Sequence, residues 1–296
     1  MRIVLFIAMQ LAVLLVVGVI GMVILPLFGI RFSPGAYSGL FIFCALMGCV
    51  GSIISLFMSK WMCKRAYGVY VITMPRNARE QFLLNTVASM AQREGFAMPE
   101  VGIYESNDPN AFATGASRDG ALVAVSSGLL YNMTDDEVRG VLGHEISHIA
   151  NGDMVTMSLL QGVLNTFVYF FSYIAAMAVS GFMNRGSDDE RSSGGSILVF
   201  HLTNMVCQIL FGILANLILM WFSRWREYRA DAGSARLEGR QCMIRALQAL
   251  QRISAPAQQP GQFQALCINA GGGMSELFMS HPPLEKRIAA LRELNL

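Results

Sequence analysis

The chain carries little charge: 14% of its 296 residues are charged, whereas 54% are apolar. This balance excludes intrinsic disorder and an ordinary soluble protein, and it favours a membrane protein. The 22 lysines and arginines form no dense basic stripe and the net charge is only +2, so nucleic acid is excluded as a partner. The six cysteines form no C-x-x-C pair and no evenly spaced framework. We interpret them as thiols in a reducing compartment or as packing residues.

Four stretches contain no Asp, Glu, Lys or Arg over more than the roughly 20 residues that a helix needs to cross about 30 Å of hydrocarbon. They are Ile3–Phe28, Ala36–Met58, Val155–Met183 and Gly195–Phe222. The first is longer than the roughly 7 to 15 apolar residues of a signal peptide, and no A-x-A site follows it. We therefore predict four transmembrane helices in two hairpins, with the lipid bilayer as a partner.

Basic residues follow the second and the fourth stretch: Lys60, Lys64, Arg65, Arg224, Arg226 and Arg229. Because basic residues near the ends of a span are retained on the cytoplasmic side, both termini and both polar segments are expected to face the cytoplasm. The expected organisation is an N-terminal transmembrane hairpin at 1–58, the first part of a cytoplasmic domain at 59–154, a second transmembrane hairpin at 155–222, and the second part of the domain at 223–296.

The two polar segments have an α+β pattern. Val69–Met74 is a short β-branched run that predicts a strand, and Asn77–Glu94 has apolar residues at helical spacing. Three short apolar runs separated by turn compositions predict a small antiparallel sheet. These runs are Val101–Tyr104, Ala111–Thr114 and Ala121–Val125. Further helices are expected at Thr134–Ala150, at Arg224–Arg236, at Arg240–Ile253 and after Pro282-Pro283.

The helix that begins at Thr134 carries the sequence H-E-I-S-H. Thr134 as N-cap, with Glu137 three residues later, predicts a capping box. Because residues four apart lie on one face of a helix, His144 and His148 can bind the same Zn²⁺, and Glu145 beside them fits a general base. With four histidines in the chain, an accidental H-E-x-x-H has an expectation on the order of 0.002.

A catalytic zinc needs a third protein ligand, and the chain lacks the histidine that extended forms of this motif place six residues after His148. Among the downstream carboxylates, Glu227 is the best placed by residue type, because Asp231 follows one helical turn later. One carboxylate can bind zinc while the other accepts the second N–H of a ligand histidine. The alternative is an ordinary carboxylate face paired with Arg224 or Arg226.

Four segments together resemble the HtpX family of bacterial membrane zinc proteases, within peptidase family M48, which is related to the zinc-dependent CaaX prenyl proteases. They are H-E-I-S-H-I-A-N-G-D at 144–153, R-E-Y-R-A-D-A-G-S-A at 226–235, N-A-F-A-T-G at 110–115 and S-H-P-P-L at 280–284. The similarity runs nearly end to end and includes the four hydrophobic runs in the same order.

The resemblance implies an α-helical membrane protein with an α+β gluzincin-type zinc metalloprotease domain. It implies one Zn²⁺ per chain, held by His144, His148 and Glu227, with Glu145 as the catalytic residue. It also implies a multi-pass protein of the bacterial inner membrane that acts in the stress response and in the quality control of misfolded membrane proteins. Functional overlap with the ATP-dependent membrane protease FtsH is part of that expectation. No ATP-binding motif appears in the sequence, so any unfolding of substrates must come from elsewhere.

Three further polar residues are candidates for binding the substrate or the oxyanion. Asn110 precedes the short strand Ala111–Thr114, whose edge can pair with an extended peptide. The resemblance also suggests a substrate-binding asparagine here, although Asp-Pro-Asn is equally a turn composition. His281 and Arg287, at the start of the last helix, can meet the negative charge that grows on a scissile carbonyl oxygen. A simple helix cap is the alternative for His281.

The sequence therefore predicts a zinc-dependent endopeptidase that cleaves cytoplasmic segments of misfolded or damaged membrane proteins. One alternative is proteolysis within the bilayer, which charged residues such as Asp135, Asp136 and Asp153 on the same segment disfavour, because each is costly in hydrocarbon. The other is a metal carrier or sensor that binds zinc without hydrolysis, and such a protein has no need of Glu145.

Overall fold

The computed structural model describes residues 34–184, 193–254 and 281–295. Its contacts divide the chain into two compact units, Met1–Ser55 with Thr156–Leu219, and Leu56–Val155 with Met220–Leu296. Three long helices have residues in both units: α2 (Pro34–Ala66), α6 (Asp153–Asn184) and α7 (Ser193–Glu238). The four domain limits expected from the sequence stay a prediction.

Three of the described helices are long and apolar enough to cross a membrane, at Tyr37–Ala66, Asp153–Met183 and Gly195–Glu238. The second, third and fourth predicted spans lie on them, and the first, Ile3–Phe28, lies outside the described residues. The chain is thus a membrane protein. At 1.5 Å per residue, the 46 residues of α7 extend about 69 Å, roughly twice the hydrocarbon thickness. The charged part of α7 after Phe222 therefore belongs outside the hydrocarbon.

In the first unit, α2 and α6 pack through small residues. A Cβ atom added to Gly48 would lie 2.8 Å from the carbonyl oxygen of Gly162, so the two backbones approach closely. The Ser158 hydroxyl donates a hydrogen bond of 2.7 Å to the carbonyl of Ser52. Small residues and hydroxyl-to-backbone bonds are the usual means by which helices associate in a membrane, where lipid removes most of the hydrophobic driving force.

The second unit holds a four-stranded sheet, made of β1 (Tyr70–Val71), β2 (Glu100–Tyr104), β3 (Ala111–Thr114) and β4 (Leu122–Ser126), in the order β1-β2-β4-β3. β1 with β2 and β3 with β4 are antiparallel, but β2 and β4 run parallel. The prediction of an antiparallel sheet was wrong for this central pair. Every residue of β4 is buried, so β4 takes a central position between two strands, and the less buried β3 takes an edge.

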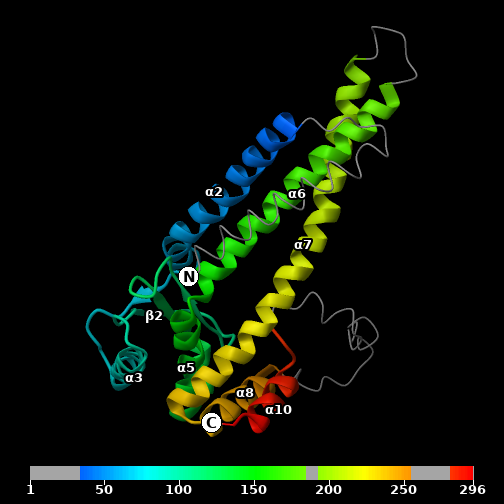
Figure 1. The fold of residues 1–296 in the computed structure, drawn as a ribbon. Coiled ribbons are helices and arrows are strands. Elements are labelled where there is room, and N and C mark those ends of the chain that lie inside the picture. Colours follow the sequence, from blue (N-terminus) through cyan, green and yellow to red (C-terminus); the bar gives the residue numbers. More distant parts are fainter. Residues whose placement is uncertain (1–33, 185–192, 255–280, 296) are drawn as a thin grey trace, which may run out of the picture. The chain divides into compact units, whose positions relative to one another are not determined.

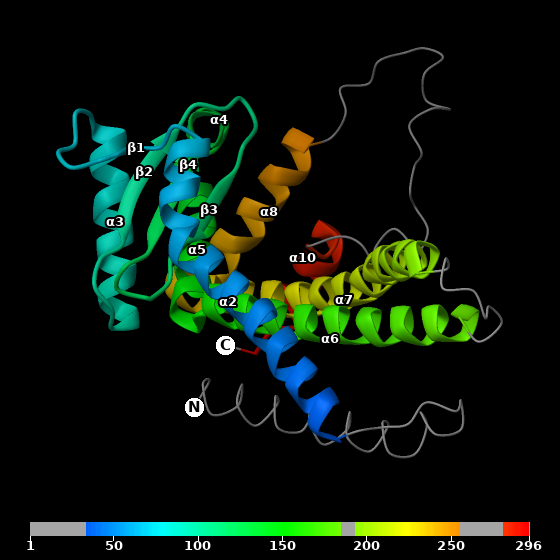
Figure 2. The ribbon, with the colours of Figure 1, turned by 90° about the horizontal axis from the view of Figure 1, so that it is seen from above.

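Helices α3 (Ala78–Glu94) and α5 (Asp135–Asn151) share one hydrophobic core with the sheet and with α8 (Arg240–Ser254). Figure 2 shows α3 beside the strands. The last helix, α10 (Leu284–Glu293), packs against α8 in a second small core (Figure 1). The short helix α4 (Ser127–Asn132) was not predicted. Five apolar side chains of α5 are buried in the main core: Val138, Val141, Leu142, Ile146 and Ile149.

The predicted capping box at the start of α5 is confirmed. The Thr134 side chain accepts a hydrogen bond from the backbone N–H of Glu137, whose carboxylate accepts one from the backbone N–H of Thr134. Arg252 of α8 donates a further bond of 2.8 Å to Glu137. Gly152 ends the helix in the left-handed conformation, with φ of 61°. Both ends of the helix that carries H-E-I-S-H are therefore anchored by local chemistry.

Candidate metal centre

The candidate metal centre lies where α5 and the charged end of α7 approach closely. A Cβ atom on Gly143 of α5 would lie 2.7 Å from the Ser234 hydroxyl oxygen, and one on Gly233 of α7 would lie 2.3 Å from that of Ser147. Ser234 also donates a hydrogen bond of 2.7 Å to the carbonyl of Gly140. This close packing brings the buried face of α7 against the histidines of α5.

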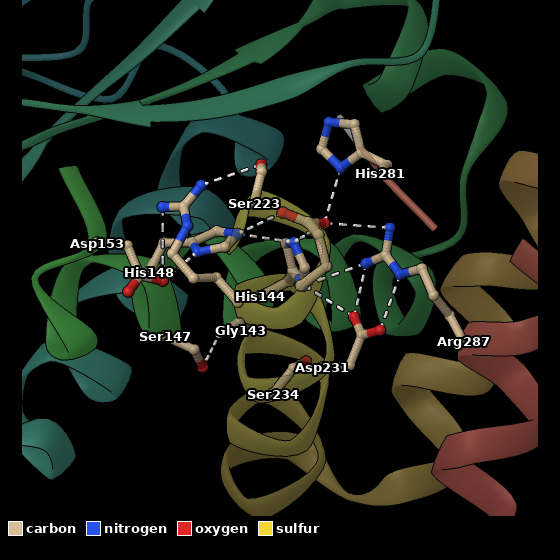
Figure 3. A network of polar contacts seen from close by, with 12 residues as sticks. Gly143, His144, Ser147, His148, Asp153, Ser223, Asp231, Ser234, His281 and Arg287 are labelled. Atoms are coloured by element: carbon tan, nitrogen blue, oxygen red, sulfur yellow. Dashed lines mark hydrogen bonds and ion pairs between the residues drawn. The ribbon is translucent and has the colours of Figure 1, made fainter. Parts of the chain in front are cut away.

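Three side chains converge at this contact (Figure 3). His144 Nε2 and His148 Nε2 are 3.1 Å apart. Glu227 places Oε2 3.3 Å from His144 Nε2 and Oε1 3.3 Å from His148 Nε2. One ligand atom from each residue lies within 4.8 Å of the others, so the group can hold a metal ion. Glu227 is 2% exposed, and its carboxylate therefore faces this group and not solvent.

Each histidine has a carboxylate on its other ring nitrogen. His144 Nδ1 is 2.9 Å from Asp231 Oδ1, and His148 Nδ1 is 2.7 Å from Asp153 Oδ2. A carboxylate only accepts hydrogen bonds, so both Nδ1 atoms carry the proton in the neutral tautomer. The lone pairs of both Nε2 atoms then point into the group. This is the outer-partner arrangement that orients histidines for metal binding.

Each of the two aspartates also contacts an arginine. Arg287 of α10 donates two hydrogen bonds to Asp231, of 2.6 and 2.8 Å, and its Nη1 lies 3.4 Å from Glu227 Oε2. Arg226 Nη1 lies 3.9 Å from Asp153 Oδ2. Both aspartates and Arg287 are buried. Buried carboxylates need such partners, because an uncompensated charge inside a protein is costly.

The electrostatics of the group favour a cation between the side chains. Burial lowers the pKa of His144, but the carboxylates of Asp231 and Glu227 outweigh burial and raise it to about 9. Burial likewise lowers the pKa of His148, and Asp153 and Glu227 raise it above its ordinary value. Glu227 Oε2 has no hydrogen bond within the described part of the chain, although cationic groups lie within ion-pair distance. A metal ion satisfies this oxygen and both Nε2 lone pairs.

Of the other predicted residues, Glu145 and His281 lie beside this group, whereas Asn110 makes no described contact with it. Glu145 is half-buried on α5, and its charge acts on the pKa values of His148 and Arg287. The exposed His281 places Nδ1 2.8 Å from Glu227 Oε2. Asn110 is exposed directly before the edge strand β3.

Asp153 is the residue that the sequence reasoning missed as part of the site. It was considered only as a charge that is costly in lipid, whereas it is the partner of His148. Its signal in the sequence is the glycine before it: Gly152, in the left-handed conformation, ends α5, and Asp153 begins α6 with its carboxylate 2.7 Å from His148 Nδ1. The i+5 spacing carries no such meaning within a continuous helix.

Comparisons with known proteins agree with this geometry. The model of peptidase family M48 matches residues 77–295. Protease HtpX of Tolumonas auensis is 56% identical over 293 residues, which cover 99% of this chain and 99% of that protein. Protease HtpX of Haemophilus influenzae is 54% identical over 294 residues, 99% of this chain and 100% of that protein. The crystal structure of Ste24p from S. mikatae matches with a TM-score of 0.61 at 21% identity, over 95% of this chain and 67% of that one. This last likeness concerns the fold.

The membrane-spanning helices, the H-E-x-x-H helix and the group of two histidines and a glutamate define a membrane-bound metalloprotease. The chain belongs to peptidase family M48.

Proposed function

We propose that the chain is a zinc-dependent endopeptidase with His144, His148 and Glu227 as the metal ligands. The observation that carries the proposal is the convergence of their ligand atoms. Tetrahedral zinc with bonds of about 2.05 Å places its ligand atoms about 3.3 Å apart. The two Nε2 atoms are 3.1 Å apart, close to this value, and each lies 3.3 Å from a different oxygen of the Glu227 carboxylate. The donor set of two imidazoles and one carboxylate is typical of catalytic zinc.

Glu145 is the general base in this proposal. Bound zinc supplies a Lewis acid that polarises the scissile carbonyl and acidifies water. Glu145 takes a proton from the attacking water and returns it to the leaving amine. Asp231 holds the imidazole of His144 in the required tautomer, and Asp153 does the same for His148. Glu145 follows His144 directly and precedes His148 by three residues on α5. This is the position of the general base in the H-E-x-x-H motif, between the two metal-binding histidines.

His281 and Arg287 are proposed to bind the oxyanion. Both reach Glu227 Oε2, at 2.8 and 3.4 Å, so an imidazole and a guanidinium group lie together at one side of the metal group. The His281 side chain is 62% exposed, which leaves it free to turn toward a bound peptide. Cationic donors placed beforehand where negative charge develops lower the barrier without later rearrangement.

Substrate is proposed to bind at β3 as an added strand. β3 is an edge strand of the sheet and contacts α5, so its free edge is close to the helix that carries Glu145. The backbone of Asn110 is fixed by Ser126, which accepts from Asn110 N–H at 2.9 Å and donates to its carbonyl at 2.8 Å. Its exposed amide side chain is then available to a peptide unit of the substrate.

The proposed substrates are cytoplasmic segments of misfolded or damaged membrane proteins. The cluster of basic residues after the spans supports a cytoplasmic active site in the inner membrane of a bacterium. The high identity to proteins named Protease HtpX supports a proteolytic role. A role in the stress response, overlapping with FtsH, is part of this proposal.

The test is the substitution Glu145→Gln in the full-length protein. We expect zinc content to stay at one ion per chain, because Glu145 is not a ligand, while casein cleavage falls by a factor of 10² or more, as for loss of a general base. Metal analysis and a cleavage assay with and without chelator measure both. A variant that cleaves at the normal rate contradicts the assignment. A protein that binds zinc but never cleaves any protein points to the metal carrier instead.

A further inference from the structure

Two membrane helices carry the same pair of side chains on the segment that follows their apolar stretch. On α2, the guanidinium carbon of Arg65 lies 5.8 Å from the ring centre of Trp61. On α7, that of Arg229 lies 4.9 Å from the ring centre of Trp225. In each pair the arginine follows the tryptophan by four residues, so both lie on one face of the helix. All four residues belong to the second compact unit.

Both pairs continue an exposed stripe of aromatic side chains. Trp61 is 58% exposed and Phe57, one turn earlier, is 71% exposed. Trp225 is 48% exposed and Trp221, again one turn earlier, is 64% exposed. Each stripe therefore runs from exposed aromatic side chains to a cationic one. This order of side chains is typical of a membrane interface, where tryptophan lies at the level of the head groups and basic residues extend into them.

A pocket of about 220 Å³ lies beside the second pair. Its lining residues are Asn151, Trp225, Tyr228, Arg229, Ala232 and Arg236. Among these described residues there are two arginines, an amide and a phenol, but no carboxylate. The guanidinium group matches a phosphate geometrically, with two parallel hydrogen bonds. The charge and the donors of the pocket thus fit an anionic phosphate, and the exposed indole fits the glycerol and acyl region next to it.

We propose that this pocket binds the head group of an anionic phospholipid, and that the Trp61–Arg65 pair on α2 makes a matching contact with the same membrane surface. Two arguments identify the occupant as lipid. The pocket lies on the helix that continues the fourth span, and its cationic groups follow the apolar stretch directly. Juxtamembrane basic residues are attracted to anionic lipid by about 1 kcal/mol each.

The lipid contact positions the metal centre. Trp225 precedes Glu227 by two residues, which is about 3 Å along the helix axis, on the other side of the helix. With Trp225 held among the head groups, the metal ligands lie just outside the membrane surface. Peptide bonds close to a transmembrane segment of a substrate are then within reach. This consequence for substrate choice rests on the proposed protease function, but the lipid contact itself does not.

The first experiment measures the depth of Trp225. The double variant Trp61→Phe/Trp221→Phe leaves Trp225 as the single tryptophan of the full-length protein. The protein is reconstituted in phosphatidylcholine vesicles that contain phosphatidylglycerol. We expect stronger fluorescence quenching by lipids brominated near the head group than by lipids brominated deep in the acyl chain, and weak quenching by aqueous iodide. Strong iodide quenching, or stronger quenching by the deep bromines, overturns the proposal.

The second experiment tests the arginine with a matched control. Brominated phosphatidylglycerol is diluted into phosphatidylcholine, and the mole fraction that gives half-maximal quenching of Trp225 is measured. Arg229→Gln should raise this mole fraction about fivefold, which corresponds to about 1 kcal/mol. Arg245→Gln, an exposed arginine of α8, should leave it unchanged.

Two outcomes of the second experiment contradict the lipid site. One is an equal effect of the two substitutions, which indicates general charge and no pocket. The other is unchanged binding in Arg229→Gln. Inorganic phosphate added to the same vesicles serves as a further arm: full displacement of the brominated lipid by it overturns the assignment to a lipid. None of these measurements depends on proteolysis, so failure of the proposed function is recognised separately, by the casein assay.

Discussion

The two histidines of the metal centre are supported by two different arrangements. His144 contacts Asp231, which receives two hydrogen bonds of 2.6 and 2.8 Å from the buried Arg287. His148 Nδ1 lies 2.7 Å from Asp153, which is shorter than the 2.9 Å between His144 and Asp231, but the nearest arginine to Asp153, Arg226, is 3.9 Å away. In Figure 3 the two aspartates lie on opposite sides of the histidine pair. The His144 half of the site, which consists of His144, Asp231 and Arg287, is thus fixed by two arginine hydrogen bonds. The His148 half, which consists of His148, Asp153 and Arg226, has only a longer contact between its aspartate and its arginine.

The difference follows from where the partners come from. The His144 half joins three elements distant in sequence, α5, α7 and α10, and its polar groups are almost fully buried. The carboxylate of the His148 half comes from the residue next to Gly152, where α5 ends. The His144 half is buried and its residues are far apart in the sequence, so it depends on the whole fold. Removing one of its charged partners therefore costs the most stability. In the His148 half, the position of Asp153 is set by the end of α5, so we expect Asp153 to stay in place even when Arg226 is replaced.

The largest effect is expected for Glu227→Gln, because both halves share this carboxylate. Replacing it removes the negative ligand while the shape is kept. Zinc affinity should fall by more than the factor of about 10 to 100 that the loss of an outer partner causes. Metal analysis after dialysis against a chelator measures the loss. A variant that retains wild-type zinc content shows that Glu227 is not a ligand.

Arg287→Gln should affect stability more than Arg226→Gln. Removing Arg287 leaves Asp231 buried without its two strongest donors, at a cost of about 3 to 5 kcal/mol. The contact of Arg226 is longer, 3.9 Å to Asp153, so a smaller loss is expected there. Thermal unfolding of the metal-free protein in detergent compares the two. Equal losses would mean that the two halves are braced equally well.

Asp231→Asn and Asp153→Asn separate the two histidines. Each should weaken zinc binding by a factor of about 10 to 100, because an amide holds the imidazole less firmly than a carboxylate. We expect Asp231→Asn at the upper end, since it also leaves Arg287 without its buried partner. Competition with a chromogenic chelator gives both affinities. The opposite order contradicts the comparison.

The smallest effect is expected at the start of α5, which carries both histidines. Thr134→Ala should lower the free energy of unfolding by about 1 kcal/mol. Because α5 carries both histidines, the substitution should affect His144 and His148 equally. Calorimetry together with zinc titration measures both quantities. A change in zinc affinity without a change in stability argues against a purely structural role of the cap.

The same cap has a pH dependence. Burial raises the pKa of Glu137, but its hydrogen bonds to Thr134 and to Arg252 outweigh burial and hold the pKa below its ordinary value. A carboxylate with a lowered pKa stabilises the fold above the pKa of the unfolded chain, near 4.3, and this contribution is lost as pH falls through the folded value. Thermal unfolding between pH 7 and pH 3 should therefore show a smaller decline in Glu137→Gln than in the wild type.

Local patterns predicted local structure well. Thr134 and Glu137 indicated where α5 begins, and the helix predicted at Thr134–Ala150 spans Asp135–Asn151 in the structure. The helix at Ala78–Glu94 and the last helix after Pro283 follow equally local signals. The parallel pairing of β2 with β4 was not predictable from runs of apolar residues, because strand order depends on which strand is buried on both sides.

The site residues likewise divide into those that local sequence patterns predicted and those that they did not. His144, Glu145 and His148 could be identified from one helical turn, and Glu227 from its residue type and from the family resemblance. Asp153 was missed because its contact with His148 depends on the left-handed conformation of Gly152, which ends α5 just before it. The bidentate bond between Arg287 and Asp231 could not be derived at all, since α7 and α10 are separated along the chain by α8.

The amino-acid sequence by itself determined the apolar helices, the ends of α5 and the imidazole pair on one helical face, because these depend on composition and on helical periodicity within a few residues. Only the tertiary structure decided which carboxylate meets which ring nitrogen and how firmly each is held. The physical reason is that such contacts form between helices whose approach is set by packing, here by Gly143 and Gly233 against two serines. No pattern along a single helix encodes that distance.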